Sequence, residues 1–149
     1  MATTELRARA LRCLARREHS RAELARKLAG HGDATEVDAV LVRMSELGLQ
    51  SDSRFAEAWV RGKAARFGSA RLRRELSQRG LEAELIDDAL AGADLEPELE
   101  RARALWRTRF GSAPGNAREW ARQARFLQSR GFSTDVIRKL LKEPDDEPA

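Results

Sequence analysis

An internal repeat constrains the fold of this chain more than any other feature. The sequence Arg-Phe-Gly-Ser-Ala at 66–70 recurs unchanged at 109–113. The apolar positions of two further segments match at one constant offset, Leu24, Leu28 and Gly32 with Leu72, Leu76 and Gly80. A unit of roughly 45 residues is too small to bury a strong core alone, so we expect neighbouring units to stack.

The spacing of apolar residues predicts helices throughout. Apolar residues recur at intervals of three and four, and alternating β-branched runs are missing. Nine rows are marked by Leu6 and Leu14, Leu24 and Leu28, Val37 and Met44, Phe55 and Trp59, Leu72 and Leu76, Leu85 and Ala89, Leu99 and Trp106, Trp120 and Leu127, and Val136 and Leu141. We therefore predict an all-α fold of three tandem three-helix repeats, stacked into an elongated curved rod.

The predicted repeats span 5–48, 49–93 and 94–142. The third repeat departs from the pattern, because it carries a loop insertion near 111–116 and places Gln123 where Leu24 and Leu72 would align. The remaining residues, 143–149, are acidic and contain two prolines, and we expect them to be disordered.

Short polar residues and glycines predict where the helices begin and end. Ser20 with Glu23, and Asn116 with Glu119, have the spacing of capping boxes. Further N-caps are expected at Asp33, Ser51 or Asp52, Ser69 and Ser133. Left-handed residues after helix ends are expected at Gly32, Gly48, Gly80, Gly92 and Gly131.

The charge distribution bears on possible partners. The segment 54–79 contains 8 basic and 2 acidic residues, and the segment 101–142 contains 11 basic and 2 acidic residues. The segment 82–100, between them, contains 8 acidic and no basic residues. One such block alone is typical of a solvated helix face. Two basic blocks around an acidic one, with a net charge of +4 and a pI near 10.0, favour a polyanionic partner. The acidic segment either contacts a basic partner or neutralises nearby arginines of the chain itself.

Three segments resemble the RecX family, in order and at the right separations. The stretch 49–60, Leu-Gln-Ser-Asp-Ser-Arg-Phe-Ala-Glu-Ala-Trp-Val, resembles the start of that family's middle repeat, and Lys63, Arg66, Gly68, Arg71 and 79–80 continue it. The stretch 125–137 resembles the end of its third repeat, and 20–28 resembles its first. The resemblance covers 5–142. Phe67 before Gly68 and the insertion near Pro114 depart from the family pattern.

The resemblance implies a modulator of RecA. Members of this family bind in the groove of the RecA filament on single-stranded DNA, suppress its ATPase, strand-exchange and co-protease activities, and also bind DNA directly. The chain would thus act in DNA repair, recombination and the SOS response, with no cofactor.

Two groups of basic residues are the candidate partner- or DNA-binding surface. In the middle repeat they are Arg54, Arg61, Lys63, Arg66, Arg71 and Arg74. In the third repeat, which also offers Arg101, Arg107 and Arg130, the stripe Arg118, Arg122 and Arg125 lies opposite Trp120 and Leu127 by its spacing. We expect Trp59, Trp106 and Trp120 to be core residues, with base stacking by Phe55 and Trp59 as the alternative.

Other classes of function have little support in the sequence. His19 and His31 lack companions at metal-ligand spacing, Cys13 has the setting of a small core residue, and phosphate-loop and nucleophile-elbow motifs are missing. We expect a cytoplasmic, monomeric protein that is neither an enzyme nor attached to a membrane. The alternative is a helical nucleic-acid-binding module that contacts phosphates of single- or double-stranded DNA without RecA.

Overall fold

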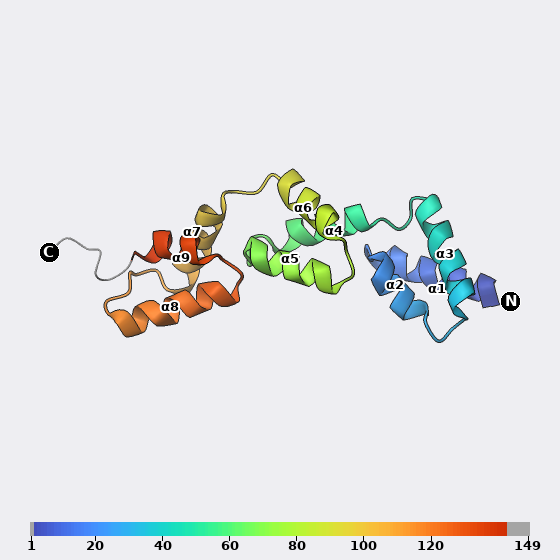
Figure 1. The fold of residues 1–149 in the computed structure, drawn as a ribbon, viewed down its shortest axis with the longest axis horizontal. Helices are drawn as coiled ribbons and strands as arrows, with labels where there is room; N and C mark the ends of the chain where they lie inside the picture. Colours follow the sequence, from blue (N-terminus) through green and yellow to red (C-terminus); the bar gives the residue numbers. More distant parts are fainter. Residues whose placement is uncertain (1, 143–149) are drawn as a thin grey trace. The chain divides into compact units, whose positions relative to one another are not determined.

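The computed structural model describes residues 2–142, which form nine helices (Figure 1). The helices are α1 (Ala2–Arg16), α2 (Arg21–Leu28), α3 (Ala34–Glu46), α4 (Asp52–Lys63), α5 (Ser69–Gln78), α6 (Ala83–Gly92), α7 (Glu98–Arg109), α8 (Ala117–Ser129) and α9 (Thr134–Leu141). Residues 2–142 contain no strand, which confirms the all-helical prediction. The predicted acidic tail at 143–149 lies outside the described residues.

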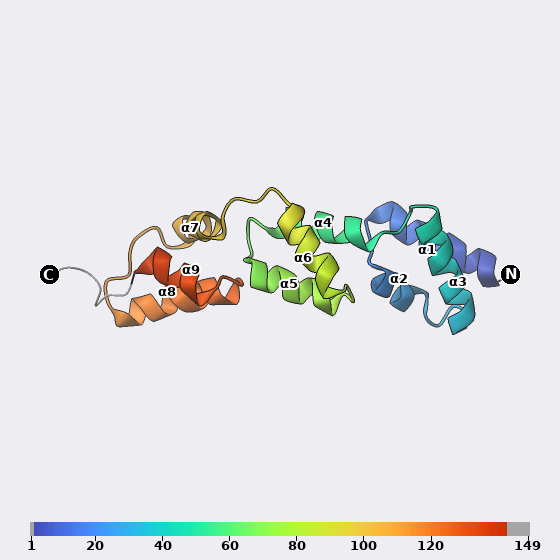
Figure 2. The same ribbon diagram turned by 45° about the horizontal axis from the view of Figure 1, so that its top comes forward.

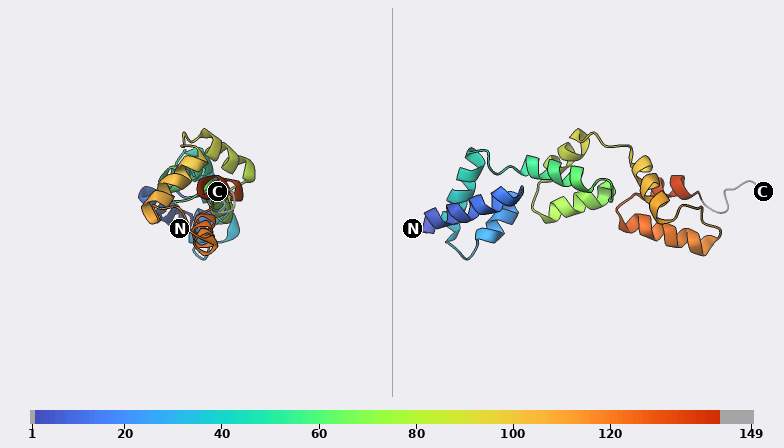
Figure 3. Two further views of the ribbon diagram at one scale, coloured as in Figure 1. Left: turned by 90° about the vertical axis from the view of Figure 1, so that its left-hand side faces the viewer. Right: turned by 180° about the vertical axis from the view of Figure 1, so that it is seen from behind.

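The first three helices pack on one another, and the view from behind in Figure 3 shows α1 beside α2 and α3. Their amphipathic faces meet in one core made of Leu6, Ala10, Leu24, Leu28, Val37, Val40, Leu41 and Met44. Cys13 is half-buried and packs against this core, so the expectation of a small core residue is met only in part.

The last three helices share a second core. Helices α7 and α8 each contact α9, and Figure 2 shows α8 running beside α9. The buried side chains are Ala102, Leu127, Phe132, Ile137 and Leu141. Half-buried Trp106 and Trp120 pack against them, so these two indoles line the core without being enclosed by it.

The described chain divides into two compact units, and the boundaries between them fall within α4, within α5 and directly after α6. One unit contains the described residues up to Trp59 together with Glu75–Gly92, and the other contains Val60–Arg74 together with the described residues from Ala93 onward. Each unit therefore combines one terminal three-helix group with part of the middle segment. The repeat boundaries at 48/49 and 93/94 remain a prediction.

Most of the predicted helix starts are correct. Ser20 and Asp33 both form complete capping boxes with the glutamate three residues later. Asn116 accepts a hydrogen bond from the Glu119 N–H, but the Glu119 carboxylate accepts from the Gly115 N–H, so that box is incomplete. Ser133 caps α9, and the Ser51 hydroxyl accepts from the Arg54 N–H.

Two of the predicted helix ends are wrong, as is one start. After α2 the left-handed residue is Gly30, with φ +89°, and not Gly32, because α2 already ends at Leu28. Gly92 belongs to α6 and has no positive φ, because the helix continues through it. Ser69 is the first residue of α5, and its N–H donates to the Glu98 carboxylate.

Candidate protein and nucleic-acid interface

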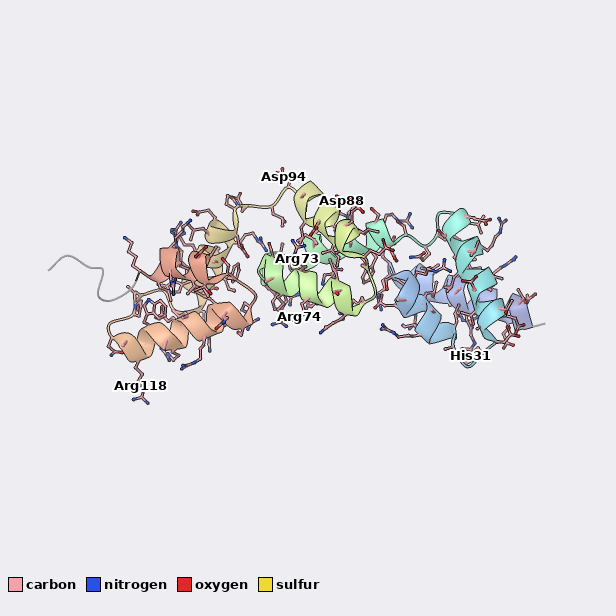
Figure 4. The ribbon with its side chains drawn as sticks, in the orientation of Figure 1. His31, Arg73, Arg74, Asp88, Asp94 and Arg118 are labelled. Atoms are coloured by element: carbon pink, nitrogen blue, oxygen red, sulfur yellow. The ribbon has the colours of Figure 1, made fainter. Side chains whose placement is uncertain are left out.

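The basic side chains predicted as a binding surface are mostly solvent-exposed. Exposed positions are Arg54, Arg61, Arg66, Arg74, Arg118, Arg122 and Arg125, and half-buried positions are Lys63 and Arg71. On α8, the Arg118 side chain extends away from the helix (Figure 4). Its neighbours Arg122 and Arg125 lie four and seven residues further along the same helix and are exposed too, as the spacing predicted.

Three of these cations surround one buried ring, Phe67, between α4 and α5. Phe67 is 7% exposed, and the Arg71 guanidinium carbon lies 4.0 Å from its centroid. Arg66 and the Lys63 ammonium lie at 5.5 Å and 5.8 Å from the same centroid. Arg71 also donates a hydrogen bond to the Ser129 carbonyl at 3.1 Å, so it is held in place rather than lying open beside Arg74.

The arrangement continues along the third helical group. Arg130 lies 5.7 Å from the Phe67 centroid and 5.0 Å from that of Phe126. Phe126 packs edge-on against Phe110 with centroids 5.4 Å apart, and Arg109 lies within 5.8 Å of both rings. Arg122 lies 5.6 Å from the Phe110 centroid. We call this alternation of charges and rings the cation–aromatic ladder, formed by Phe67, Phe110, Phe126, Lys63, Arg66, Arg71, Arg109, Arg122 and Arg130.

A guanidinium stacked on a ring is restricted in its rotamers yet keeps the N–H donors at its edge. Within residues 2–142, no carboxylate is paired with Arg66, Arg109, Arg122 or Arg130. These four arginines of the ladder therefore present un-neutralised donors next to aromatic rings, which suit bidentate contacts to phosphate or carboxylate oxygens.

Two glycines bring the two ends of the ladder together. The Gly68 N–H donates to the Arg130 carbonyl at 2.6 Å, and the Ala70 N–H donates to the Gly131 carbonyl at 3.3 Å. A Cβ atom on Gly131 would contact the Arg71 Cβ and lie 2.6 Å from the Arg71 nitrogen. The close approach of these two turns places Arg130 between Phe67 and Phe126.

The remaining candidates lie outside the ladder. Arg54 forms an ion pair with Glu18, with a distance of 3.1 Å between Nε and Oε1, so its charge is already partly offset. Arg61, Arg74, Arg118 and Arg125 have no carboxylate partner in the described part of the chain. They add exposed charge without the fixed geometry of the ladder.

Arg101, expected among the basic surface residues of the third repeat, is instead buried. Its side chain donates to the carbonyls of Ala64 at 3.0 Å and Phe67 at 2.6 Å. Burial lowers the pKa of this guanidinium, and the nearby Glu98 charge opposes that shift. The two hydrogen bonds of Arg101 thus join α7 to the turn that carries Phe67, and they stabilise the position of this ring in the ladder.

The aromatic pair in α4 does not offer a base-stacking platform. Phe55 is 3% exposed and belongs to the core. Trp59, expected in the core, is only half-buried: its Nε1 donates to Glu75 at 3.1 Å, and the Arg79 guanidinium covers its ring at 4.0 Å.

Sequence reasoning did not select Arg109, and it named Arg130 only among the further basic residues of the third repeat, outside the predicted stripe. The available signal was the pairing of arginine with phenylalanine at 66–67, 109–110 and 125–126, because such pairs place a cation next to a ring. What the pairing alone does not reveal is which rings meet, since that depends on the Gly68–Arg130 contact.

Residues 2–142 contain no group of three or more His, Cys, Asp or Glu side chains arranged to hold a metal ion. Among the same residues, every helix is too short or too polar to cross a bilayer.

Models of one family match nearly the whole chain. The first, second and third three-helix domains of RecX match residues 7–44, 51–90 and 96–141. The regulatory protein RecX of Leptothrix cholodnii is 54% identical over 95% of this chain and 90% of its own length. That of Chromobacterium violaceum is 45% identical over 95% of this chain and 92% of its own length.

Solved structures support the fold independently. A crystal structure of RecX from Lactobacillus salivarius matches with a TM-score of 0.78 and 22% identity, covering 97% of each chain. A second crystal structure, described as regulatory protein RecX, matches with a TM-score of 0.79 and 23% identity over 95% of this chain and 73% of that one. At these identities the likeness concerns the fold alone.

Proposed function

Because the chain belongs to the RecX family of regulatory proteins, we propose that it binds the RecA filament on single-stranded DNA and inhibits it. The activities restrained are RecA ATPase, strand exchange and co-protease function. The chain acts by binding and carries out no reaction of its own. It works as a monomer in the cytoplasm, where RecA assembles on DNA, and so takes part in repair, recombination and the SOS response.

The single observation that best supports this proposal is the cation–aromatic ladder. A nucleoprotein filament presents phosphates and acidic side chains together, and both are acceptors for fixed guanidinium donors. Arg66, Arg109, Arg122 and Arg130 have no carboxylate partner among the described residues, so their donors remain available to such a target.

Four further exposed cations belong to the same unit as the ladder. Arg61 and Arg74 lie on α4 and α5, and Arg118 and Arg125 lie on α8. We assign these residues to long-range attraction, because mobile exposed charges raise association rates more than they fix a bound geometry. Arg54, paired with Glu18, has the smallest share in this role.

The alternative function is a nucleic-acid-binding module that needs no RecA. It draws on the same basic residues, which would contact phosphates of single- or double-stranded DNA. The two functions differ in salt dependence, because binding through phosphates alone weakens log-linearly with salt concentration.

Co-sedimentation distinguishes them. The protein is mixed with single-stranded DNA alone, or with RecA, a slowly hydrolysed nucleotide and the same DNA, across a range of salt. We expect the RecA filament to retain the protein at salt concentrations that release it from bare DNA. Equal release from both would favour the alternative.

A variant pair ties the result to the ladder. Arg122→Gln with Arg130→Gln removes two ladder charges, whereas Arg7→Gln with Arg43→Gln removes two exposed charges of α1 and α3. We expect only the first pair to lose filament binding, by about tenfold or more, because each lost charge-assisted hydrogen bond contributes roughly 1.5–3 kcal/mol. Equal losses in both would point to net charge rather than to the ladder.

A further inference from the structure

A second concentration of positive charge lies in the first helical group. A cavity of about 690 Å³ opens there between α1, α2 and the segment joining them. Its charged and titratable wall consists of Arg9, Arg12, Arg16, Arg17, Lys27 and His19.

Most of these charges lack a counter-charge in the protein. Arg17 is paired with Glu23 at 3.2 Å. Arg9, Arg12, Arg16 and Lys27 have no carboxylate partner anywhere in residues 2–142. Like charges held around one cavity repel one another, so the empty cavity is electrostatically unfavourable and a bound anion would relieve it.

Two buried polar atoms of the wall also lack partners. His19 is 1% exposed, and its Nδ1 lies 3.0 Å from the Arg17 carbonyl, which requires a hydrogen on Nδ1 and leaves Nε2 without one in the neutral ring. The His19 Nε2 and the Arg9 Nε are both buried with no hydrogen-bond partner among the described residues. Buried polar atoms are nearly always satisfied in folded proteins. The Arg9 Nε is a donor that an anion would satisfy, whereas the His19 Nε2 can donate to an anion only when the ring is protonated.

The arrangement of the cations suits an extended anion. Arg9, Arg12 and Arg16 lie on one face of α1 at intervals of three and four residues, so their Cα atoms advance by about 4.5 Å and 6 Å along the axis. Lys27, on α2, lines the same cavity. A single small anion would meet one or two of these groups, whereas several linked anionic groups would meet all four.

The chemistry of the wall favours phosphates over the side chains of an acidic peptide. Its charged groups are hydrogen-bond donors, and linked phosphates offer acceptors only. A peptide would bring backbone N–H groups into a cavity with few acceptors, where unpaired donors are costly. Guanidinium groups also bind phosphate oxygens in pairs.

We propose that this cavity binds a run of linked phosphates, either in a free polyphosphate such as a nucleoside triphosphate or in the backbone of a nucleic-acid strand. The site shares no residue with the cation–aromatic ladder. Its existence does not depend on RecA binding, so the two proposals fail independently.

The test is calorimetric titration of the full chain with inorganic tripolyphosphate at moderate salt. Arg12→Gln with Arg16→Gln removes two exposed wall charges, and the Arg7→Gln with Arg43→Gln protein is the matched control with the same net charge. We expect the wall variant to lose affinity by about tenfold or more and the control by less than about twofold. Equal losses, or no binding by the unaltered chain to tripolyphosphate or to a short oligothymidylate, would overturn the proposal.

Competing ligands identify the source of the phosphates. A short oligothymidylate is added as a competitor for the cavity. If it displaces tripolyphosphate, and if the Arg12→Gln with Arg16→Gln protein no longer binds it, the ligand is a nucleic-acid strand. If it does not displace tripolyphosphate, the ligand is a free polyphosphate. Binding of tetraglutamate as tight as that of tripolyphosphate would overturn the assignment to phosphates.

Nuclear magnetic resonance of the two histidines adds a local readout. Burial lowers the pKa of His19, the hydrogen bond to the Arg17 carbonyl opposes this shift, and the charges of Arg17 and Lys27 lower the pKa further. A bound anion offsets those cations, so the pKa of His19 should rise when tripolyphosphate is added. His31 is exposed and does not line the cavity, so its ring signals serve as the reference. Equal shifts of both histidines, or none, would contradict binding in this cavity.

Discussion

The Gly68 N–H donates to the Arg130 carbonyl at 2.6 Å, and an equivalent contact occurs in the other unit, where the Ser20 hydroxyl donates to the Arg79 carbonyl at 2.8 Å. At the offset that aligns the first two repeats, Ser20 corresponds to Gly68, and Arg79-Gly80 matches Arg130-Gly131 in sequence. In both units the start of one repeat's second helix thus meets the turn before the next repeat's third helix.

The glycine after each arginine is what permits this approach. A Cβ on Gly80 would lie 2.5 Å from the Ala22 Cβ, and one on Gly131 would overlap the Arg71 side chain. Both glycines have positive φ, of +85° and +93°. We call this contact between a helix start and a turn the joint, and we infer that it connects each repeat to the next in the same way. Four predictions concern the joint and other residues of the two units.

Gly131→Ala should destabilise the protein more than Gly48→Ala. Both substitutions force alanine into a left-handed conformation, which costs about 1–2 kcal/mol. Only Gly131 has a neighbour in the way, since a Cβ on Gly48 would meet nothing within 4 Å. Urea denaturation should show the larger loss for Gly131→Ala, and equal losses would mean that the joint is not tightly packed.

Arg101→Met should also destabilise the protein, although it removes a buried charge. Methionine retains the packing of the side chain but leaves the Ala64 and Phe67 carbonyls without donors, at a cost of about 1–3 kcal/mol. Arg103→Met is the control, because Arg103 makes only a short-range pair with Glu100, worth about 0.3–0.5 kcal/mol. If both variants unfold at the same urea concentration, Arg101 does not hold α7 in place.

Gln123→Leu restores the residue found at the equivalent positions 24 and 72, yet it should not stabilise the fold. Buried Gln123 accepts from the Trp106 Nε1 at 2.8 Å and donates to the Ser112 carbonyl at 3.2 Å. Leucine would leave the indole N–H unpaired, at a cost of about 1 kcal/mol. In a Trp106→Phe background this cost should disappear, and a double-mutant cycle of unfolding free energies with no coupling would refute the account.

Stability should fall as the pH decreases from about 7.5 to about 5.5, in phosphate-free buffer. The pKa of folded His19 lies below its ordinary value of 6.5, chiefly because the ring is buried. The unfolded chain therefore binds a proton more readily, and stability is lost as the pH falls through 6.5 toward the folded pKa. Glu23, whose pKa is lowered by the Arg17 and Ser20 hydrogen bonds, responds only below its ordinary 4.5.

His19→Asn is the control for that pH dependence. Its amide can still donate to the Arg17 carbonyl, as the His19 Nδ1 does, but it does not titrate. Denaturation midpoints of this variant should change less over the same pH range. An unchanged pH dependence would mean that another group is responsible.

The sequence was sufficient to predict the helices, because apolar spacing and capping residues are local signals. Ser20 with Glu23 and Asp33 with Glu36 close their boxes within four residues, so no distant contact is needed to form them. The misplaced glycine after α2 shows the limit of this reasoning, since Gly30 and Gly32 are both available and only packing selects between them.

The site was predictable only in part, because its geometry depends on contacts between distant segments. The spacing of Arg118, Arg122 and Arg125 correctly indicated an exposed stripe on α8. The burial of Arg101 follows from carbonyls 34 and 37 residues away, and the position of Arg130 follows from the turn at Gly68, which is even more distant along the chain. The number of charged residues in a segment contains no information about such distant partners, so Arg101 was expected at the surface.

RecA ATPase on single-stranded DNA, titrated with this protein at moderate salt, tests the central claim most directly. The account predicts inhibition well below one molecule per RecA protomer, with the Arg122→Gln and Arg130→Gln protein weaker and the Arg7→Gln and Arg43→Gln protein unchanged. Inhibition that appears only when the added protein suffices to coat all of the DNA would contradict it, because simple competition for phosphates would then explain the effect.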